Sequence, residues 1–236
     1  MACGGMGAYN EGALSFRDRL VATLHAIRPV LAEPGVLIVG SQVPNLLTPN
    51  PPAQIVISKD VDVGVAVGAH GRVKGRLAEL RGLYPSPEEP AGWLPEGDLL
   101  EVNFVGIDPA LTDPTESYVL EDARLPLLVF GALSLLRPAP SVDVEGLAVP
   151  VPEAAGLLLE KLLTDRSGEK GDRDLLVALA LMDAAGADGS ASQRKELART
   201  YAKLSPDLRH QVRSNLTLLS LLPSRDGMPD PGPRRG

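Results

Sequence analysis

The segment that decides the fold runs from residue 36 to residue 67 and reads VLIVGSQVPNLLTPNPPAQIVISKDVDVGVAV. Its first four residues are apolar and stop at Gly40-Ser41, which is typical of a short strand that ends in a turn. The proline-rich residues 48–54 cannot form a helix interior and predict a loop. A β-branched run follows and predicts a second strand, which ends near residue 67.

The second run carries two carboxylates, Asp60 and Asp62, on one face. Side chains two residues apart in a strand share a face, so both aspartates lie opposite the apolar series Val61, Val63 and Val65. A rise of roughly 3.3 Å per residue places the two carboxylates about 7 Å apart. Such a pair on a strand built for burial indicates a cation. Mg²⁺ binds carboxylate oxygens and keeps coordination sites open for phosphate.

A purely structural interpretation of Asp-x-Asp stands beside the metal interpretation, because charges also protect strand edges from aggregation. The preceding Gly40-Ser41 favours the metal, since a strand that ends in Gly-Ser before a short helix presents N–H groups and a hydroxyl to phosphate. The alternating run at residues 98–105 favours it further. Its polar face carries Glu101, a third acid, together with Asn103.

Composition limits the classes of function that remain. The 236 residues suffice for one large or two small domains with a substantial core. The net charge of −7 argues against a large non-specific nucleic-acid surface. The single cysteine, Cys3, excludes a disulfide framework and a Cys-based zinc site. No apolar run approaches the roughly 18 residues of a membrane span, and residues 1–10 do not resemble a signal peptide. We therefore expect a cytoplasmic protein without a membrane partner.

The remaining pattern predicts the other elements of the first part of the chain. A helix is expected over residues 15–31 with Ser15 as its N-cap. The further expectations are a helix over 72–83, an irregular segment over 84–96 anchored by Trp93, a strand over 98–105, a loop over 107–122, short apolar runs at 125–130 and 133–136, and a hairpin over 142–151 that turns at Glu145-Gly146. Base stacking is the alternative role for Trp93.

After residue 152 the pattern becomes helical. Helices are predicted over 153–164, 172–185, 192–204 and 206–221, and Ser205-Pro206-Asp207 is a strong start signal for the last. The sequence thus predicts an α+β fold with a mixed sheet, flanking helices and a C-terminal helical bundle. We expect an α/β domain over residues 1–150, a helical domain over 151–224 and a disordered tail over 225–236.

This order of parts resembles the nucleotidyltransferase superfamily with the DNA polymerase β-like fold. The mark of that superfamily is Gly-Ser at the end of one strand, Asp-x-Asp on the next and a third acid on a later strand. The matching residues are Gly40, Ser41, Asp60, Asp62 and Glu101. The resemblance covers roughly residues 36–185.

Within the superfamily, the chain resembles the minimal and abortive-infection (AbiEii-type) nucleotidyltransferases. In those proteins a helix with a lysine is followed by an Arg/Lys-Asp pair that opens the next apolar helix. Lys161 and Arg173-Asp174 match that segment, and Ser58-Lys59-Asp60-Val61-Asp62 is similar to their Thr-Lys-Asp-Ile-Asp.

The resemblance implies transfer of a nucleoside monophosphate from a triphosphate to a hydroxyl of a tRNA, a protein or a small molecule. It also implies a toxin-like role with an antitoxin partner. In such a reaction the hydroxyl attacks the α-phosphorus and pyrophosphate leaves. The implied roles are Mg²⁺ binding and catalysis for Asp60, Asp62 and Glu101, and nucleotide binding for Gly40, Ser41, Lys161, Arg173 and Asp174.

Three features depart from the family pattern. The loop from Ser41 to Asp60 is long and proline-rich, no arginine follows Gly-Ser, and the third acid is Glu where Asp is common. A catalytically degenerate module that binds a nucleotide or a partner protein is therefore the second hypothesis. A dinucleotide-binding unit is the third, although GxGxxG is absent and Pro44 stands where its helix should run.

Overall fold

The computed structural model describes residues 14–47, 58–163, 169–184 and 191–221. Within these residues seven strands form one mixed sheet: β1 Val36–Val39, β2 Asp60–Ala66, β3 Leu83–Pro85, β4 Gly92–Pro95, β5 Glu101–Ile107, β6 Ser117–Leu120 and β7 Leu127–Phe130. The order is β1-β2-β5-β4-β3, with β7 on the second half of β5 and β6 on β7. Strand β1 is antiparallel to β2, whereas β2 and β5 are parallel. A dinucleotide-binding unit needs parallel strands joined by a helix, so the third hypothesis is wrong.

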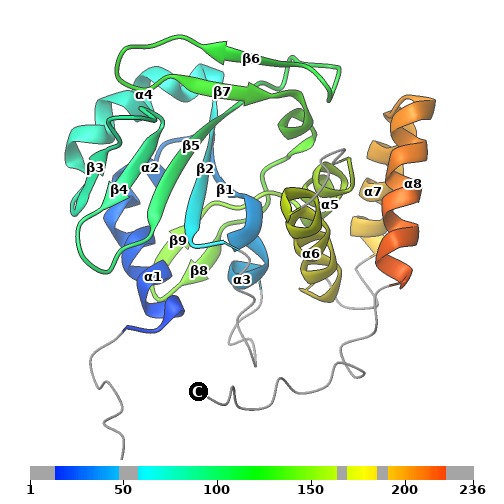
Figure 1. Ribbon diagram of the computed structural model, residues 1–236, viewed down its shortest axis with the longest axis horizontal. Helices are drawn as coiled ribbons and strands as arrows, with labels where there is room; N and C mark the ends of the chain where they lie inside the picture. The colour runs from blue at the N-terminus through cyan, green and yellow to red at the C-terminus, as the bar shows by residue number, and fades with distance from the viewer. Residues whose placement is uncertain (1–13, 48–57, 164–168, 185–190, 222–236) are drawn as a thin grey trace, which may run out of the picture.

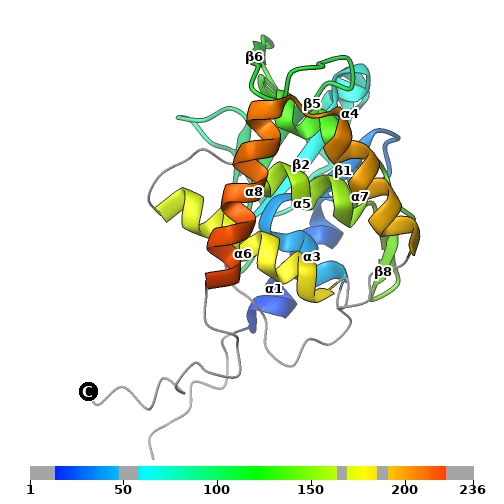
Figure 2. The same ribbon diagram turned by 90° about the vertical axis from the view of Figure 1, so that its right-hand side faces the viewer.

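Helices flank this sheet, and the predicted α+β class is confirmed (Figure 1). Their bounds are α1 Phe16–Ala26, α2 Arg28–Leu31, α3 Val43–Leu47, α4 His70–Arg76, α5 Ala154–Leu162, α6 Glu169–Ala184, α7 Ala191–Lys203 and α8 Pro206–Leu221. Short 3₁₀ turns are η1 Gly40–Gln42, η2 Val67–Ala69, η3 Leu77–Glu79 and η4 Gly131–Leu135. The predicted hairpin is β8 Val142–Val144 with β9 Leu147–Val149. Figure 2 shows α5 to α8 together on the side that faces the viewer.

Strand β2 alternates as its sequence predicts. Val61, Val63 and Val65 are fully buried, whereas Asp60 and Asp62 are only partly buried on the opposite face. The valines pack into the main core with the apolar residues of β1, β5 and α1. The burial of one face therefore fixes the register of β2. A slip by one residue would turn both carboxylates into the apolar core and the valines out of it.

Helix α1 holds the beginning of β5 in place. Ser15 and Asp18 form the predicted N-terminal cap, with both reciprocal hydrogen bonds of a capping box. Further along the helix, Nε of Arg19 donates to the carbonyl of Asp98 at 2.8 Å, and Oγ1 of Thr23 accepts from the Leu100 amide at 2.8 Å. These bonds fix the backbone immediately before Glu101.

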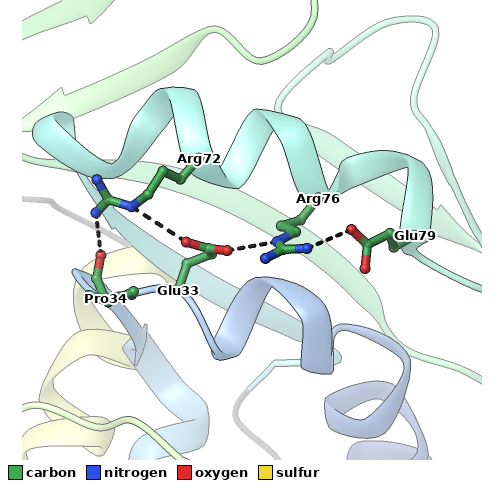
Figure 3. Close-up of polar contacts among 5 residues, drawn as sticks. All are labelled: Glu33, Pro34, Arg72, Arg76 and Glu79. Atoms are coloured by element: carbon green, nitrogen blue, oxygen red, sulfur yellow. Dashed lines mark hydrogen bonds and ion pairs between the residues drawn. The ribbon is translucent and has the colours of Figure 1, made fainter.

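Figure 3 shows a chain of ion pairs that attaches α4 to the turn before β1. Glu33 accepts from Nε of Arg76 at 2.7 Å and lies 3.4 Å from Nε of Arg72. Arg72 also donates to the carbonyl of Pro34 at 2.9 Å, and Arg76 to Glu79 at 3.0 Å. The arginines are about half exposed, so these pairs contribute little to stability. They lie at the end of β1 opposite to the Gly-Ser turn, so their role is to hold α4 in place.

Several expectations for the middle of the chain are wrong. Residues 84–96 are not irregular throughout, because they contain most of β3 and all of β4. Pro85 is tolerated on the edge strand β3, and Pro95 lies at the end of β4 beyond its pairing with β5. Trp93 does not anchor its own loop but meets Phe104 of β5 edge-to-face, with ring centroids 6.4 Å apart. The expected loop at 107–122 contains β6, whose mostly exposed side chains give no apolar alternation. The helix expected over 72–83 ends earlier, in η3.

The C-terminal helices confirm the predicted positions, although residues 164 and 185 lie outside the described residues. Helices α5 and α6 contribute Leu157, Val177 and Leu181 to the main core. A second cluster joins α5 to α8 through Leu159, Leu162, Ala178, Leu204, Val212 and Leu219. The domain division at residue 150 stays a prediction, and the expected tail at 225–236 lies outside the described residues. Among the helices described, none has the length and apolar character that crossing a bilayer requires.

Candidate active site

Four polar side chains form a two-by-two array on the face of the sheet opposite the buried valines. Parallel pairing of β2 with β5 sets Asp60 beside Glu101 and Asp62 beside Asn103. Paired residues of neighbouring strands share a face, and so do residues two apart in one strand. We call these four residues the polar array. Carboxylates occupy three of its corners and an amide the fourth.

The two carboxylate oxygens of Asp60 differ in their hydrogen bonding. Its Oδ2 accepts a hydrogen bond from Nδ2 of Asn103 at 3.0 Å. Its Oδ1 is buried and has no hydrogen-bond partner among the described residues. A buried oxygen without a partner has lost its hydrogen bonds to water and gained none from the protein, which is unfavourable. A ligand that supplies positive charge would offset that loss.

Asp62 lies in an environment that opposes its charge. Burial raises the pKa of Asp62 to about 7, and the nearby charges of Asp60 and Glu160 add to the effect, although Lys161 and a hydrogen bond from Asn103 act in the opposite direction. Two neighbouring carboxylates that resist joint ionisation are a common feature of functional sites.

This raised pKa makes a prediction about stability. The folded protein holds a proton on Asp62 that the unfolded chain, with a pKa of roughly 3.9, has released. The free energy of unfolding therefore falls as the pH rises from about 4 to about 7. We expect the free energy of unfolding of Asp62→Asn to decrease less with pH than that of the wild type. Above about pH 7 and without divalent cations, the variant should be more stable by on the order of 1–4 kcal/mol. Urea unfolding at about pH 5 and pH 8 in EDTA measures this, and equal losses in both proteins would contradict it.

Gly40 brings the backbone close to Asp62. Its φ of +72° is a conformation that side chains disfavour, and a Cβ at this position would overlap Oδ2 of Asp62. The glycine at the end of β1 is therefore required by both the turn and the neighbouring carboxylate.

We expect Gly40→Ala to destabilise the protein by more than the roughly 1 kcal/mol of an ordinary glycine substitution, because backbone strain and the overlap with Asp62 add together. Thermal unfolding measures the effect. Gly146→Ala is the matched control, since Gly146 also has a positive φ, of +83°, but open space around it. Equal destabilisation by the two variants would show that the overlap has no effect.

Ser41 and Gln42 connect the turn after β1 to the beginning of β2. Oγ of Ser41 lies 2.5 Å from Oγ of Ser58, so the hydroxyl proposed for phosphate already has a protein partner. Nε2 of Gln42 donates to the carbonyls of Ser58 and Asp60 at 3.1 and 3.0 Å, and its Oε1 accepts from Asn45 at 3.1 Å. Gln42 is 1% exposed. Sequence reasoning missed it. A polar residue that directly follows Gly-Ser and precedes Val43 was the available signal.

Lys161 is held between two acids of the helical region. Its Nζ lies 3.1 Å from Oε2 of Glu160 and 3.0 Å from Oδ1 of Asp174, and all three side chains are 11% exposed. Burial alone would lower the pKa of Lys161, but the two acids outweigh burial and raise it. Two of the residues predicted to bind nucleotide, Lys161 and Asp174, are therefore in direct contact. The lysine charge is already balanced by two protein carboxylates.

A cavity of about 430 Å³ lies between the sheet and the C-terminal helices. Its wall includes Gly40 and Asp62 from the sheet and Glu160, Lys161 and Asp174 from α5 and α6. Four of the eight predicted site residues are thus on this wall. The other four, Ser41, Asp60, Glu101 and Arg173, are not part of it. Arg173 is partly buried, and its Nε has no hydrogen-bond partner among the described residues.

The residues of the polar array fit a hard divalent cation in part. Burial raises the pKa of Glu101, and Asp60 and Glu89 raise it further. Among the described residues, no three His, Cys, Asp or Glu side chains are grouped closely enough to hold a metal. Mg²⁺ needs no such group, because it is usually bound through one or two carboxylates together with substrate phosphates and water. The free Oδ1 of Asp60 and the charge-disfavoured Asp62 fit that mode. Metal binding by all three acids stays a prediction.

Comparisons with known proteins found likeness at the level of structure. No family model matches the chain, and no curated protein matches its sequence. The antibiotic-resistance factor ANT(2'')-Ia is similar over 82% of this chain and 97% of its own, with 16% identity and a TM-score of 0.42. An antigenic nucleotidyltransferase-like protein from Paracoccidioides brasiliensis is similar over 84% and 92%, with 14% identity and a TM-score of 0.37. The finer likeness to AbiEii-type proteins stays a prediction.

Proposed function

We propose that this protein is a Mg²⁺-dependent nucleotidyltransferase that moves a nucleoside monophosphate from a triphosphate to a hydroxyl acceptor. The observation that carries the proposal is the pair Asp60 and Asp62 on one face of β2, against the glycine turn that ends β1. Support comes from Oδ1 of Asp60, which is buried and has no hydrogen-bond partner in the described part of the chain. We propose a tRNA, a protein or a small molecule as the class of acceptor, and an antitoxin as a partner.

Asp60 and Asp62 would hold Mg²⁺, which when bound neutralises phosphate charge and lowers the pKa of a bound hydroxyl. Glu101, beside Asp60 in the array, would accept the proton of the acceptor hydroxyl; its raised pKa suits a base. The backbone of Gly40 would approach the phosphates closely, because no side chain intervenes.

The charges around the cavity explain why a cation is needed. Among the described residues of the cavity wall, the acids Asp62, Glu116, Glu160 and Asp174 outnumber the cation Lys161, which Glu160 and Asp174 already contact. A bare triphosphate would therefore meet a net negative wall. We propose that Lys161 positions Glu160 and Asp174, and that the divalent cation supplies the charge that attracts the nucleotide.

The test is nucleotide binding with and without Mg²⁺, measured as the shift of the melting temperature with each of the four ribonucleoside triphosphates. A ligand that binds only the folded state raises its stability in proportion to the logarithm of its concentration. We expect at least one nucleotide to raise the melting temperature with Mg²⁺ and none to do so in EDTA. Equal shifts in both conditions, or none in either, would contradict the proposal.

A non-catalytic module that binds a nucleotide or a partner protein is the second candidate. Two observations favour it: no three acids are grouped among the described residues, and the amide of Asn103 fills the fourth corner of the array. Incubation with α-labelled nucleotides and a mixture of tRNA and protein separates the candidates. Labelled product supports transfer, whereas Mg²⁺-dependent binding without product supports the module.

A further inference from the structure

Asn103 is the neutral member of the polar array. Its neighbours there are three carboxylates: Asp62 across the strand pair, Glu101 two residues before it in β5, and Asp60 on the diagonal. A strand face with so much negative charge would gain from a basic residue at the fourth corner, but it carries an amide. An amide offers both donor and acceptor groups without adding charge.

The contacts of Asn103 show what the amide does. Its Nδ2 donates to Oδ2 of Asp60 at 3.0 Å, and the side chain also forms a hydrogen bond to Asp62. Oδ2 of Asp60 accepts this bond, so the nitrogen of the amide is the side that faces Asp60. Asp60 is thereby held by one oxygen, and its other oxygen, Oδ1, is the buried one without a partner.

The backbone of β5 is held in place at Asn103. Its strand is paired on both sides, with Asp62 of β2 and with Gly92 of β4 at this position. A Cβ on Gly92 would lie 3.4 Å from Oδ1 of Asn103 and 3.2 Å from the carbonyl of Glu89. A side chain at residue 92 would thus reach the amide oxygen at about contact distance, whereas the amide nitrogen faces Asp60.

We infer that Asn103 is a positioning residue: it holds Oδ2 of Asp60 and so leaves Oδ1 as the oxygen that a divalent cation binds. The inference rests on the proposed function, because it requires a cation at Asp60. It also explains why the fourth corner is an amide. A carboxylate at residue 103 would have no N–H to donate and would repel both aspartates.

The test measures Mn²⁺ alone, added to the full-length protein, with the signal of free Mn²⁺ in electron paramagnetic resonance as the readout. We expect the wild type to bind Mn²⁺ and Asp60→Ala to lose this binding. Asn103→Ala should bind about 10- to 100-fold more weakly, the usual cost of removing a residue that orients a metal ligand. The matched control is Asn215→Ala, which removes an amide that donates to the Leu162 carbonyl at 3.0 Å, in α8 and outside the array. Because Asn215 lies outside the array, this variant should bind Mn²⁺ within about twofold of the wild type.

The possible results separate this inference from the proposed function. If the wild type binds Mn²⁺ no better than Asp60→Ala, this inference fails, whereas the proposed function is decided by the nucleotide-binding test, in which phosphates complete the metal site. If the wild type binds but Asn103→Ala equals Asn215→Ala, the inference alone fails. Melting in EDTA checks that each variant is folded. Asn103→Val, which suits a strand and also lacks the donor, replaces the alanine variant if that one is unfolded, with the same expected loss.

Discussion

Replacement of Asp60 by alanine is expected to abolish nucleotidyl transfer, with a loss of about 10³-fold or more. Asp60 supplies the free, buried Oδ1 and holds the hydrogen bond from Asn103. Loss of a metal ligand removes several kcal/mol of charge stabilisation in the transition state, and each 1.4 kcal/mol is roughly a factor of ten in rate. The measurement is formation of labelled product from α-labelled nucleotide under saturating Mg²⁺.

The control for this variant is Asp143→Ala, which removes an exposed carboxylate in the β8–β9 hairpin, remote from the array in the sequence. It should retain the activity of the wild type. Because Asp60 and Asp62 repel each other, Asp60→Ala should also keep or raise the melting temperature in EDTA. Retention of activity by Asp60→Ala would show that this carboxylate holds no essential cation.

Replacement of Lys161 by methionine is expected to destabilise the protein by about 3–5 kcal/mol, because it removes the cation that both Glu160 and Asp174 contact in a buried position. For a chain of this size the melting temperature would fall by roughly 10 °C. A lysine that served mainly to bind phosphate would instead affect nucleotide affinity with little change in stability. Thermal unfolding without nucleotide separates the two roles.

Arg199→Met is the matched control, because it also removes a cation from an ion pair, with Glu196 at 2.6 Å, but on the surface of α7. Surface pairs contribute little, so the melting temperature should change far less than in Lys161→Met. Equal melting temperatures for the two variants would contradict a structural role of Lys161.

The sequence predicts which side chains of β2 and β5 face the core. Apolar residues recur every second position at Val61, Val63 and Val65, and polar and apolar residues alternate around Glu101. The pairing of the two strands could not be predicted. Their parallel register sets Asn103, rather than Glu101, beside Asp62. A shift of two residues would keep every face and exchange these neighbours. Asn103 was visible on the polar face but had no assigned role for that reason.

The ion-pair partners of Lys161 in the helical region could not be predicted from the sequence either. Lys161 in a leucine-rich helix indicates a cation near the acidic strand, and the structure places it on the cavity wall with Asp62. Its two carboxylate partners come from its own helix and from α6, and only packing of α5 against α6 brings Asp174 to it. Gln42 is similar: a single buried amide within a 3₁₀ turn has no periodic signature, yet it fixes the backbone of Asp60.

Diffraction from crystals grown with Mn²⁺ and a non-hydrolysable nucleoside triphosphate tests the central claim most directly, because anomalous scattering locates the metal. We predict a peak at roughly 2.0–2.2 Å from Oδ1 of Asp60 and from a carboxylate oxygen of Asp62, with the phosphates completing the coordination. An ordered nucleotide with Mn²⁺ bound elsewhere, or with no Mn²⁺ at these two aspartates, would contradict it.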